Sequence, residues 1–269
     1  MRSIRDHEAR STDRRFRRDS HLVTVLSPHF DDVALSLGQS LRDGRLSRHP
    51  VRVRVAFGKT NWTSWVHPTP ERAGYVSVWR RLEESAASLA FGYRWTAASW
   101  PEVILRTGDM SPEQILDSSR DLATEPLVAE MARWISAVRR APQGRGTRNR
   151  PPELILVAAG LGGHIDHRIL SSAAETVARR SGAPIGFYED RPYSAYLSED
   201  DRDRHMASFG LDLRPVPVSL PVQMSTQVLA RMCYPSQMSP YFREAMDLDR
   251  RVSAVEQIWF PGGVAPDWF

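Results

Sequence analysis

The chain has 269 residues, of which 41% are hydrophobic and 25% are charged. These fractions are typical of globular proteins and exclude a wholly disordered or collagen-like chain. No stretch approaches the roughly 18 apolar residues of a membrane-spanning helix, and the first residues lack the apolar segment of a secretory signal. We therefore expect a cytoplasmic protein without a membrane partner.

Charge is distributed unevenly along the chain. Residues 1–20 contain seven arginines and four acidic residues, so they carry three of the four net positive charges. A solvated terminus explains this basic stretch more simply than recognition of phosphates. We predict a disordered tail over 1–20, a folded domain over 21–269 and no nucleic-acid partner. The alternative, a nucleic-acid-binding module, predicts salt-dependent binding that deletion of the tail removes.

Apolar runs with strand-like and helix-like spacing alternate along the rest of the chain. A charged connection at 140–152 contains glycine and proline and predicts a surface loop, which leaves open whether it acts as a lid. Alternation of this kind predicts one Rossmann-like α/β domain with a mainly parallel sheet flanked by helices. The predicted strands are 21–27, 51–57, 93–100, 154–159, 185–188 and 216–220, and the predicted helices are 34–41, 75–91, 111–139, 168–180, 223–233 and 239–260.

Histidines and aspartates gather in two short segments, each directly after a predicted strand. These are residues 28–32 (PHFDD) and residues 164–167 (HIDH). Ligands bind at the carboxyl ends of the strands in an open parallel sheet, so both segments can face one cleft. Because Cys233 is the only cysteine, a metal site here must use histidine and carboxylate ligands.

The spacing within these segments is suitable for a metal. His29 and Asp32 lie three residues apart and point the same way if the loop begins to coil. Either His164 or His167 completes a set of two histidines and one carboxylate, which zinc accepts while keeping a position open for water. Asp31 can then act as the base that deprotonates this water. Taken singly, the aspartates are typical of a helix N-cap and the second segment of a turn, but their joint occurrence favours a metal site.

Both segments resemble the motifs of a known family, the zinc-dependent PIG-L/LmbE-like N-deacetylases. LSPHFDD is similar to the family's strand followed by His-Pro-Asp-Asp, and GGHIDH matches its His-x-Asp-His motif. Residues 80–87, with Gly92 behind them, resemble its Arg-x-x-Glu helix, and residues 188–193 and 234–237 resemble later segments. The resemblance spans about residues 22–260 and implies an amide hydrolase that acts on N-acetylglucosamine derivatives and related metabolites.

The resemblance also implies roles for individual residues. His29, Asp32 and His167 match the three zinc ligands, although these ligand types also accept iron(II) or cobalt(II). Asp31 matches the general base. His164 and Asp166 of the second motif match residues with other roles.

His164 matches the residue that stabilises the oxyanion and protonates the leaving amine. Asp166 matches the partner that orients and charges a histidine, and we expect it to keep His164 protonated by raising its pKa. In this scheme the metal polarises the amide carbonyl while His164 donates to the developing negative charge.

Substrate contacts are less specific in the sequence. Arg80 matches a family arginine that contacts substrate hydroxyl or phosphate groups, and the alternative is an ion pair with an acidic residue one turn further on. Tyr193 is a candidate for stacking on a sugar or an aromatic group, together with Trp62, Trp65 and Tyr196. Packing of these aromatic side chains under long loops explains them equally well.

One position departs from the family pattern, because Phe30 stands where proline is usual. We expect the ligand geometry to persist, since proline supplies rigidity but no donor atom. A large apolar side chain at this position either packs in the core or lines the pocket.

The leading prediction is a zinc-dependent hydrolase that removes an N-acyl group, with acetyl expected, from an amino sugar, a glycoside or a sugar-bearing natural product. The alternative is an amidase that uses the same metal machinery on a non-sugar amide. A nucleotide-binding α/β protein is a third class, but neither segment contains Gly-x-Gly-x-x-Gly or a phosphate-loop lysine.

Overall fold

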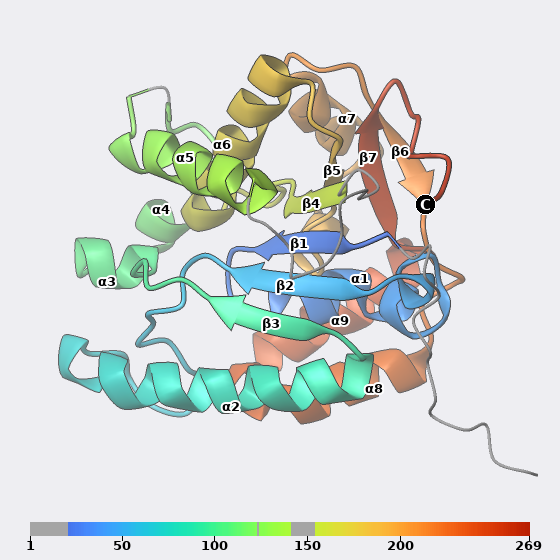
Figure 1. Ribbon diagram of the computed structural model, residues 1–269. Helices are drawn as coiled ribbons and strands as arrows, with labels where there is room; N and C mark the ends of the chain where they lie inside the picture. Colours follow the sequence, from blue (N-terminus) through green and yellow to red (C-terminus); the bar gives the residue numbers. More distant parts are fainter. Residues whose placement is uncertain (1–20, 123, 141–153) are drawn as a thin grey trace, which may run out of the picture.

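A seven-stranded mixed sheet forms the centre of the protein, with the strand order β3-β2-β1-β4-β5-β7-β6 (Figure 1). The computed structural model describes residues 21–122, 124–140 and 154–269. The predicted tail and nearly all of the predicted loop at 140–152 therefore lie outside the described residues. The strands are β1 (Val23–Ser27), β2 (Val51–Val55), β3 (Arg94–Ala97), β4 (Leu154–Ala158), β5 (Ile185–Tyr188), β6 (Leu213–Pro217) and β7 (Gln257–Pro261).

Helices cover both faces of this sheet (Figure 1). On one face, α1, α2, α8 and α9 pack around a core that includes Leu37, Phe91 and Met246. On the other, α5 and α6 pack around a second core that includes Met131 and Leu170. The α-helices are α1 (Asp32–Asp43), α2 (Ala73–Phe91), α3 (Val103–Thr107), α4 (Pro112–Ile115), α5 (Pro126–Arg140), α6 (Ile165–Ser181), α7 (Glu199–Ala207), α8 (Met224–Cys233) and α9 (Pro240–Val252).

Strands β1 to β5 run parallel, whereas β7 pairs antiparallel with both β5 and β6. This arrangement confirms the predicted α/β class and its mainly parallel sheet. The chain order runs outward from β1 through β2 to β3 on one side and from β4 to β5 on the other. The boundary between β1 and β4 is therefore the point where the strand order reverses, which is where open α/β sheets bind ligands.

Several predicted boundaries are wrong for physical reasons. The predicted helix 239–260 ends at Val252, because the apolar run at 258–260 pairs with β5 and β6 as strand β7. The predicted helix 111–139 divides into α4 and α5, since Pro126 begins a new helix and cannot continue an old one. The predicted strand 216–220 lies earlier, at 213–217, and the short helices α3 and α7 were not predicted.

No helix in the described ranges has the length and apolar composition needed to cross a bilayer. Short 3-10 turns connect the larger elements. They are η1 (Leu46–Arg48), η2 (Pro70–Arg72), η3 (Tyr193–Tyr196) and η4 (Pro235–Gln237).

Candidate metal centre and active site

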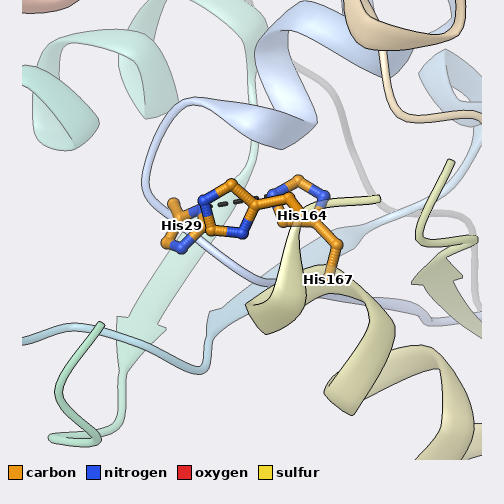
Figure 2. A group of neighbouring side chains, drawn as sticks. All are labelled: His29, His164 and His167. Carbon is orange, nitrogen blue, oxygen red and sulfur yellow. Dashed lines mark hydrogen bonds between the residues drawn. The ribbon is translucent and has the colours of Figure 1, made fainter. Parts of the chain in front are cut away.

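The two predicted segments meet because β1 and β4 are neighbours in the sheet. Residues 28–31 connect β1 with α1, and residues 159–164 connect β4 with α6. Figure 2 shows His29 approaching from the first connection and His164 and His167 from the start of α6, with their rings turned toward one another. Ligand atoms of these three histidines all lie within 4.8 Å of one another, so together they offer a candidate metal site.

Backbone geometry places each segment. The second connection requires glycine at Gly162, which has φ +84°, and a Cβ there would lie 2.7 Å from Cβ of Tyr193. In the first, Asp31 occupies the N-cap position of α1 but its side chain makes no capping hydrogen bond. Asp32 instead reaches back, and its Oδ2 accepts a hydrogen bond of 2.7 Å from the backbone N–H of His29. The N-cap alternative for Asp31 therefore does not describe what its side chain does.

A compact triangle of ligand atoms lies inside this cluster. His29 Nδ1 and His167 Nε2 are 3.2 Å apart, and each is 3.5 Å from Asp32 Oδ2. A tetrahedral zinc ion with nitrogen and oxygen ligands at about 2.0–2.1 Å separates its ligand atoms by about 3.3 Å. The triangle therefore fits the ligand spacing of a small divalent cation.

Each histidine of the triangle is held from behind by a buried carboxylate. His29 Nε2 lies 3.1 Å from Asp166 Oδ2, and His167 Nδ1 lies 2.5 Å from Asp190 Oδ1. Neutral rings that donate to these carboxylates direct the lone pairs of His29 Nδ1 and His167 Nε2 at the same point. Two lone pairs at this separation need a proton or a cation between them, and carboxylates behind ligating histidines are typical of metal sites.

The electrostatics support the same conclusion. Burial works against the charged form of His29, but hydrogen bonds to Asp166 and Asp32 raise its pKa well above the ordinary value. Burial likewise opposes the charge on His167, and the charge of Asp32 and the Asp190 contact raise its pKa. The surrounding carboxylates thus stabilise positive charge at the centre of the triangle, which a divalent cation would supply.

The Asp31 side chain contacts α2. Its Oδ1 accepts a hydrogen bond of 2.9 Å from Arg80 Nη2, and the other end of the same guanidinium lies 2.9 Å from Glu83 Oε2. Burial opposes the charge on Arg80, but Asp31 and Glu83 raise its pKa above the ordinary value. Only 3% of Arg80 is exposed, so in this structure the residue holds Asp31, and its contact with substrate stays a prediction.

The expectation that Asp166 keeps His164 protonated is wrong. The Asp166 carboxylate contacts His29, the backbone N–H of Val103 and the guanidinium of Arg106 at 2.7 Å, and it does not hold the His164 ring. His164 Nδ1 instead accepts a hydrogen bond from the backbone N–H of Asp166. Burial, followed by the charges of His29 and His167, lowers the pKa of His164 well below its ordinary value. The lowered pKa and the accepting Nδ1 favour the neutral ring with its proton on Nε2.

The aromatic candidates divide between the site and the surface. Tyr193 stands edge-on to His167 with ring centroids 6.0 Å apart, so it lies beside the candidate metal centre. Trp65 and Tyr196 pack on other exposed aromatic rings, of Trp79 and Tyr241. The Phe30 side chain is buried in the core, edge-on to Trp95, and does not line the pocket.

Three residues of the site were not predicted. Asp190 follows the end of β5, so the strand-end argument applied to 185–188 contained the signal that could have found it. Arg106 lies on α3 and Glu102 at its N-terminus, and nothing in the local sequence marks them. Burial raises the pKa of Glu102 to about 7, against the opposing charge of His29 and a hydrogen bond from Thr60.

Comparison with known proteins gives a curated relative and several solved structures. No family model matches the sequence. A 2'-N-acetylparomamine deacetylase from Streptomyces fradiae is 28% identical over 184 residues, which cover 67% of this chain and 60% of the relative. The chain thus matches about three fifths of the length of this curated relative.

Solved structures share the fold over nearly the whole chain. A deacetylase of the teicoplanin biosynthesis pathway superposes with a TM-score of 0.62 at 20% identity, covering 88% of this chain and 96% of the other. The N,N'-diacetylchitobiose deacetylase from Pyrococcus horikoshii superposes with a TM-score of 0.54 at 14% identity, covering 93% and 88%. The chain is therefore similar in sequence to a curated deacetylase and shares the fold of solved deacetylases. These matches agree with the resemblance of the two motifs to that family, and the pairing of β1 with β4 explains why the motifs share one edge of the sheet.

Proposed function

We propose that this LmbE-like chain is a metal-dependent N-deacetylase that removes an acyl group, with acetyl expected, from the nitrogen of an amino sugar or a sugar-bearing natural product. The triangle of His29 Nδ1, His167 Nε2 and Asp32 Oδ2 carries the proposal, because its edges of 3.2 to 3.5 Å suit zinc. The N-acetylated amino sugar named for the Streptomyces fradiae relative supports the substrate class.

Asp32 is the preferred third ligand over His164. Its Oδ2 lies 3.5 Å from both facing nitrogens, whereas the three-histidine group spans up to 4.8 Å. A divalent cation bound by His29, Asp32 and His167 would polarise the amide carbonyl and acidify the attacking water. The other residues named below act on protons and on developing charge.

Asp31 is the general base of the proposed reaction. The bond from Arg80 occupies its Oδ1, and within the described ranges Oδ2 has no hydrogen-bond partner, so this oxygen can accept a proton from the attacking water. The neutral His164 donates its Nε2–H to the carbonyl oxygen as negative charge develops there. Because a neutral imidazole is a poor acid, the proton now on Asp31 goes to the leaving nitrogen as the carbon–nitrogen bond breaks. The products are a free amine and a carboxylic acid, which releases its proton to become a carboxylate.

The proposal is tested by metal content together with amine release from a substrate panel. The panel contains 2'-N-acetylparomamine, N,N'-diacetylchitobiose, N-acetylglucosamine and simple non-sugar amides, with zinc, iron(II) or cobalt(II) supplied in turn. We expect about one metal ion per chain for the wild type and for Asp31→Ala, with amine release abolished in the variant. Loss of metal in Asp32→Ala and its retention in His164→Ala would support the ligand set.

Other outcomes separate the alternatives. Turnover of non-sugar amides without turnover of any sugar would favour the amidase alternative, which uses the same residues. Failure to bind any divalent metal after reconstitution would refute the deacetylase. Full activity in Asp31→Ala would remove this residue from the reaction.

A further inference from the structure

A buried polar cluster lies directly behind the segment that carries His29 and Asp31. Glu84 of α2 is hydrogen-bonded to Tyr93 Oη at 3.0 Å and to Tyr234 Oη at 2.6 Å. Glu84 and Tyr234 are 0% exposed and Tyr93 is 6% exposed, so the cluster is closed to solvent. None of these three side chains takes part in the proposed reaction.

Only one of the two tyrosines reaches the catalytic segment. Tyr234 Oη lies 2.9 Å from the backbone carbonyl oxygen of Phe30, the residue between His29 and Asp31. Tyr93 Oη lies 3.4 Å from Tyr234 Oη and contacts Glu84, but it makes no bond to residues 28–32 among the hydrogen bonds of the described chain. The two hydroxyls are thus matched in burial and in their carboxyl partner, and they differ in this one contact.

Proton counting favours donation from Tyr234 to the Phe30 carbonyl. The Tyr234 hydroxyl has a single proton and two oxygen neighbours, Glu84 Oε2 and Phe30 O. Burial raises the pKa of Glu84 to about 8, so near neutral pH this carboxyl is protonated and can donate to Tyr234. Tyr234 then donates its hydrogen bond to the carbonyl oxygen of Phe30, and each polar atom of the cluster has a hydrogen-bond partner.

A second contact leads from the same stretch of chain to the Asp31 side chain. Ser236 donates from its backbone N–H and its Oγ to Glu83, each at 2.8 Å. Glu83 holds Arg80, and Arg80 holds Asp31. Residues 234–236 therefore reach the catalytic segment twice, once through the Phe30 backbone and once through the Asp31 carboxylate.

We propose that Tyr234 is a positioning residue, whose hydroxyl fixes the Phe30 carbonyl and thereby holds the ligands His29 and Asp32 and the base Asp31 in register. This inference rests on the proposed function. Phe30 lacks the backbone restraint that a proline would impose, so its conformation depends on contacts such as this hydrogen bond and the burial of its ring. Misplacement of a reacting group by about 1 Å costs up to roughly a hundredfold in rate.

The test compares Tyr234→Phe with the matched control Tyr93→Phe in the full-length protein. Each variant deletes one buried hydroxyl that bonds Glu84, so a merely structural role predicts equal effects on both. The measurements are the apparent zinc dissociation constant by chelator competition, kcat and KM on the best amide of the panel, and Tm. For Tyr234→Phe we expect a zinc affinity and a kcat about tenfold lower, with KM little changed. For Tyr93→Phe we expect both within about twofold of wild type, with a similar drop in Tm.

Ser236→Ala provides a second variant that is informative even if Tyr234→Phe does not fold. It removes the Oγ contact to Glu83 that leads to Asp31, together with a hydrogen bond from Gln237 Nε2, and leaves the Phe30 contact in place, so we expect kcat to fall about threefold with zinc affinity unchanged. Equal losses of zinc affinity in the two tyrosine variants, or an unchanged kcat in both Tyr234→Phe and Ser236→Ala, would overturn the proposal. If the wild type binds zinc but hydrolyses no amide, the proposed function fails, and the zinc affinities alone decide the role of Tyr234. If the wild type binds no metal, both fail.

Discussion

Replacement of Asp190 by asparagine tests whether this outer carboxylate decides which nitrogen of His167 is free to bind a metal. The Asp190 carboxylate is 2% exposed and accepts two hydrogen bonds, from His167 Nδ1 at 2.5 Å and from the backbone N–H of Leu161 at 2.9 Å. An asparagine has only one acceptor oxygen. If that oxygen serves Leu161, the amide NH2 faces His167 Nδ1 and drives the ring proton to Nε2, the atom that points at the candidate metal centre.

The size of the effect follows from the lost interaction. To bind zinc through Nε2, His167 in the variant must move its ring proton back to Nδ1. This loses about one hydrogen bond to a charged group, or roughly 1.5–3 kcal/mol. That free energy corresponds to a zinc affinity about 10 to 100 times lower, the range usual for partners behind a ligating histidine. The assay is titration with zinc in competition with a chromophoric chelator, at fixed pH.

Asp249→Asn is the matched control for this experiment. Asp249 is 3% exposed and accepts hydrogen bonds from Arg191 Nε at 2.8 and 3.0 Å. Neither hydrogen bond involves a proposed metal ligand. We expect this variant to lose thermal stability and to keep its zinc affinity within about twofold. Zinc binding by Asp190→Asn that equals the wild type, or equal losses in both variants, would refute the tautomer argument.

Two further predictions concern stability. Arg80→Met leaves the buried carboxylates of Asp31 and Glu83 without their cation and should lower the free energy of unfolding by about 3–5 kcal/mol in urea denaturation. The control Arg204→Met breaks an ion pair with Asp201 in which the arginine side chain is 76% exposed, and it should change the free energy of unfolding by less than about 1 kcal/mol. Similar losses in both would contradict the role of burial. Burial raises the pKa of Glu84 from 4.5 to about 8, so the folded state binds a proton that the unfolded state releases, and this group makes stability fall as the pH rises between these values. Glu84→Gln should remove a decline on the order of a few kcal/mol, and an unchanged stability–pH profile would show that Glu84 is ionised in the fold.

Much of the site could be predicted because its chemistry is concentrated at strand ends. The run before His29 and the run before His164 both have the apolar, β-branched pattern of buried parallel strands. Parallel strands end at one edge of a sheet, so two polar segments that follow such strands can meet without any knowledge of the tertiary structure. This reasoning located His29, Asp32, His164 and His167 in one place.

The same reasoning failed where a contact depends on distant chain segments. Strand β7 has a helix-like sequence context on its N-terminal side, and only pairing with β5 and β6 makes 257–261 a strand. Arg106 was not marked because it reaches the site from a short helix after β3. The partner of Asp166 was assigned to the wrong histidine, since proximity in sequence to His164 says nothing about which ring the carboxylate meets in space.

The sequence by itself therefore determined the fold class and the inventory of candidate ligands, because these follow from local periodicity and from residue types at strand ends, and its two motifs carried the family resemblance. Only the tertiary structure decided how those residues are held. It placed Asp190 and Asp166 behind the two facing histidines, Arg80 on Asp31, and Tyr234 on the Phe30 carbonyl. The physical reason is that tautomers, pKa values and orientation depend on burial and on partners separated by tens to hundreds of residues, which no local pattern encodes.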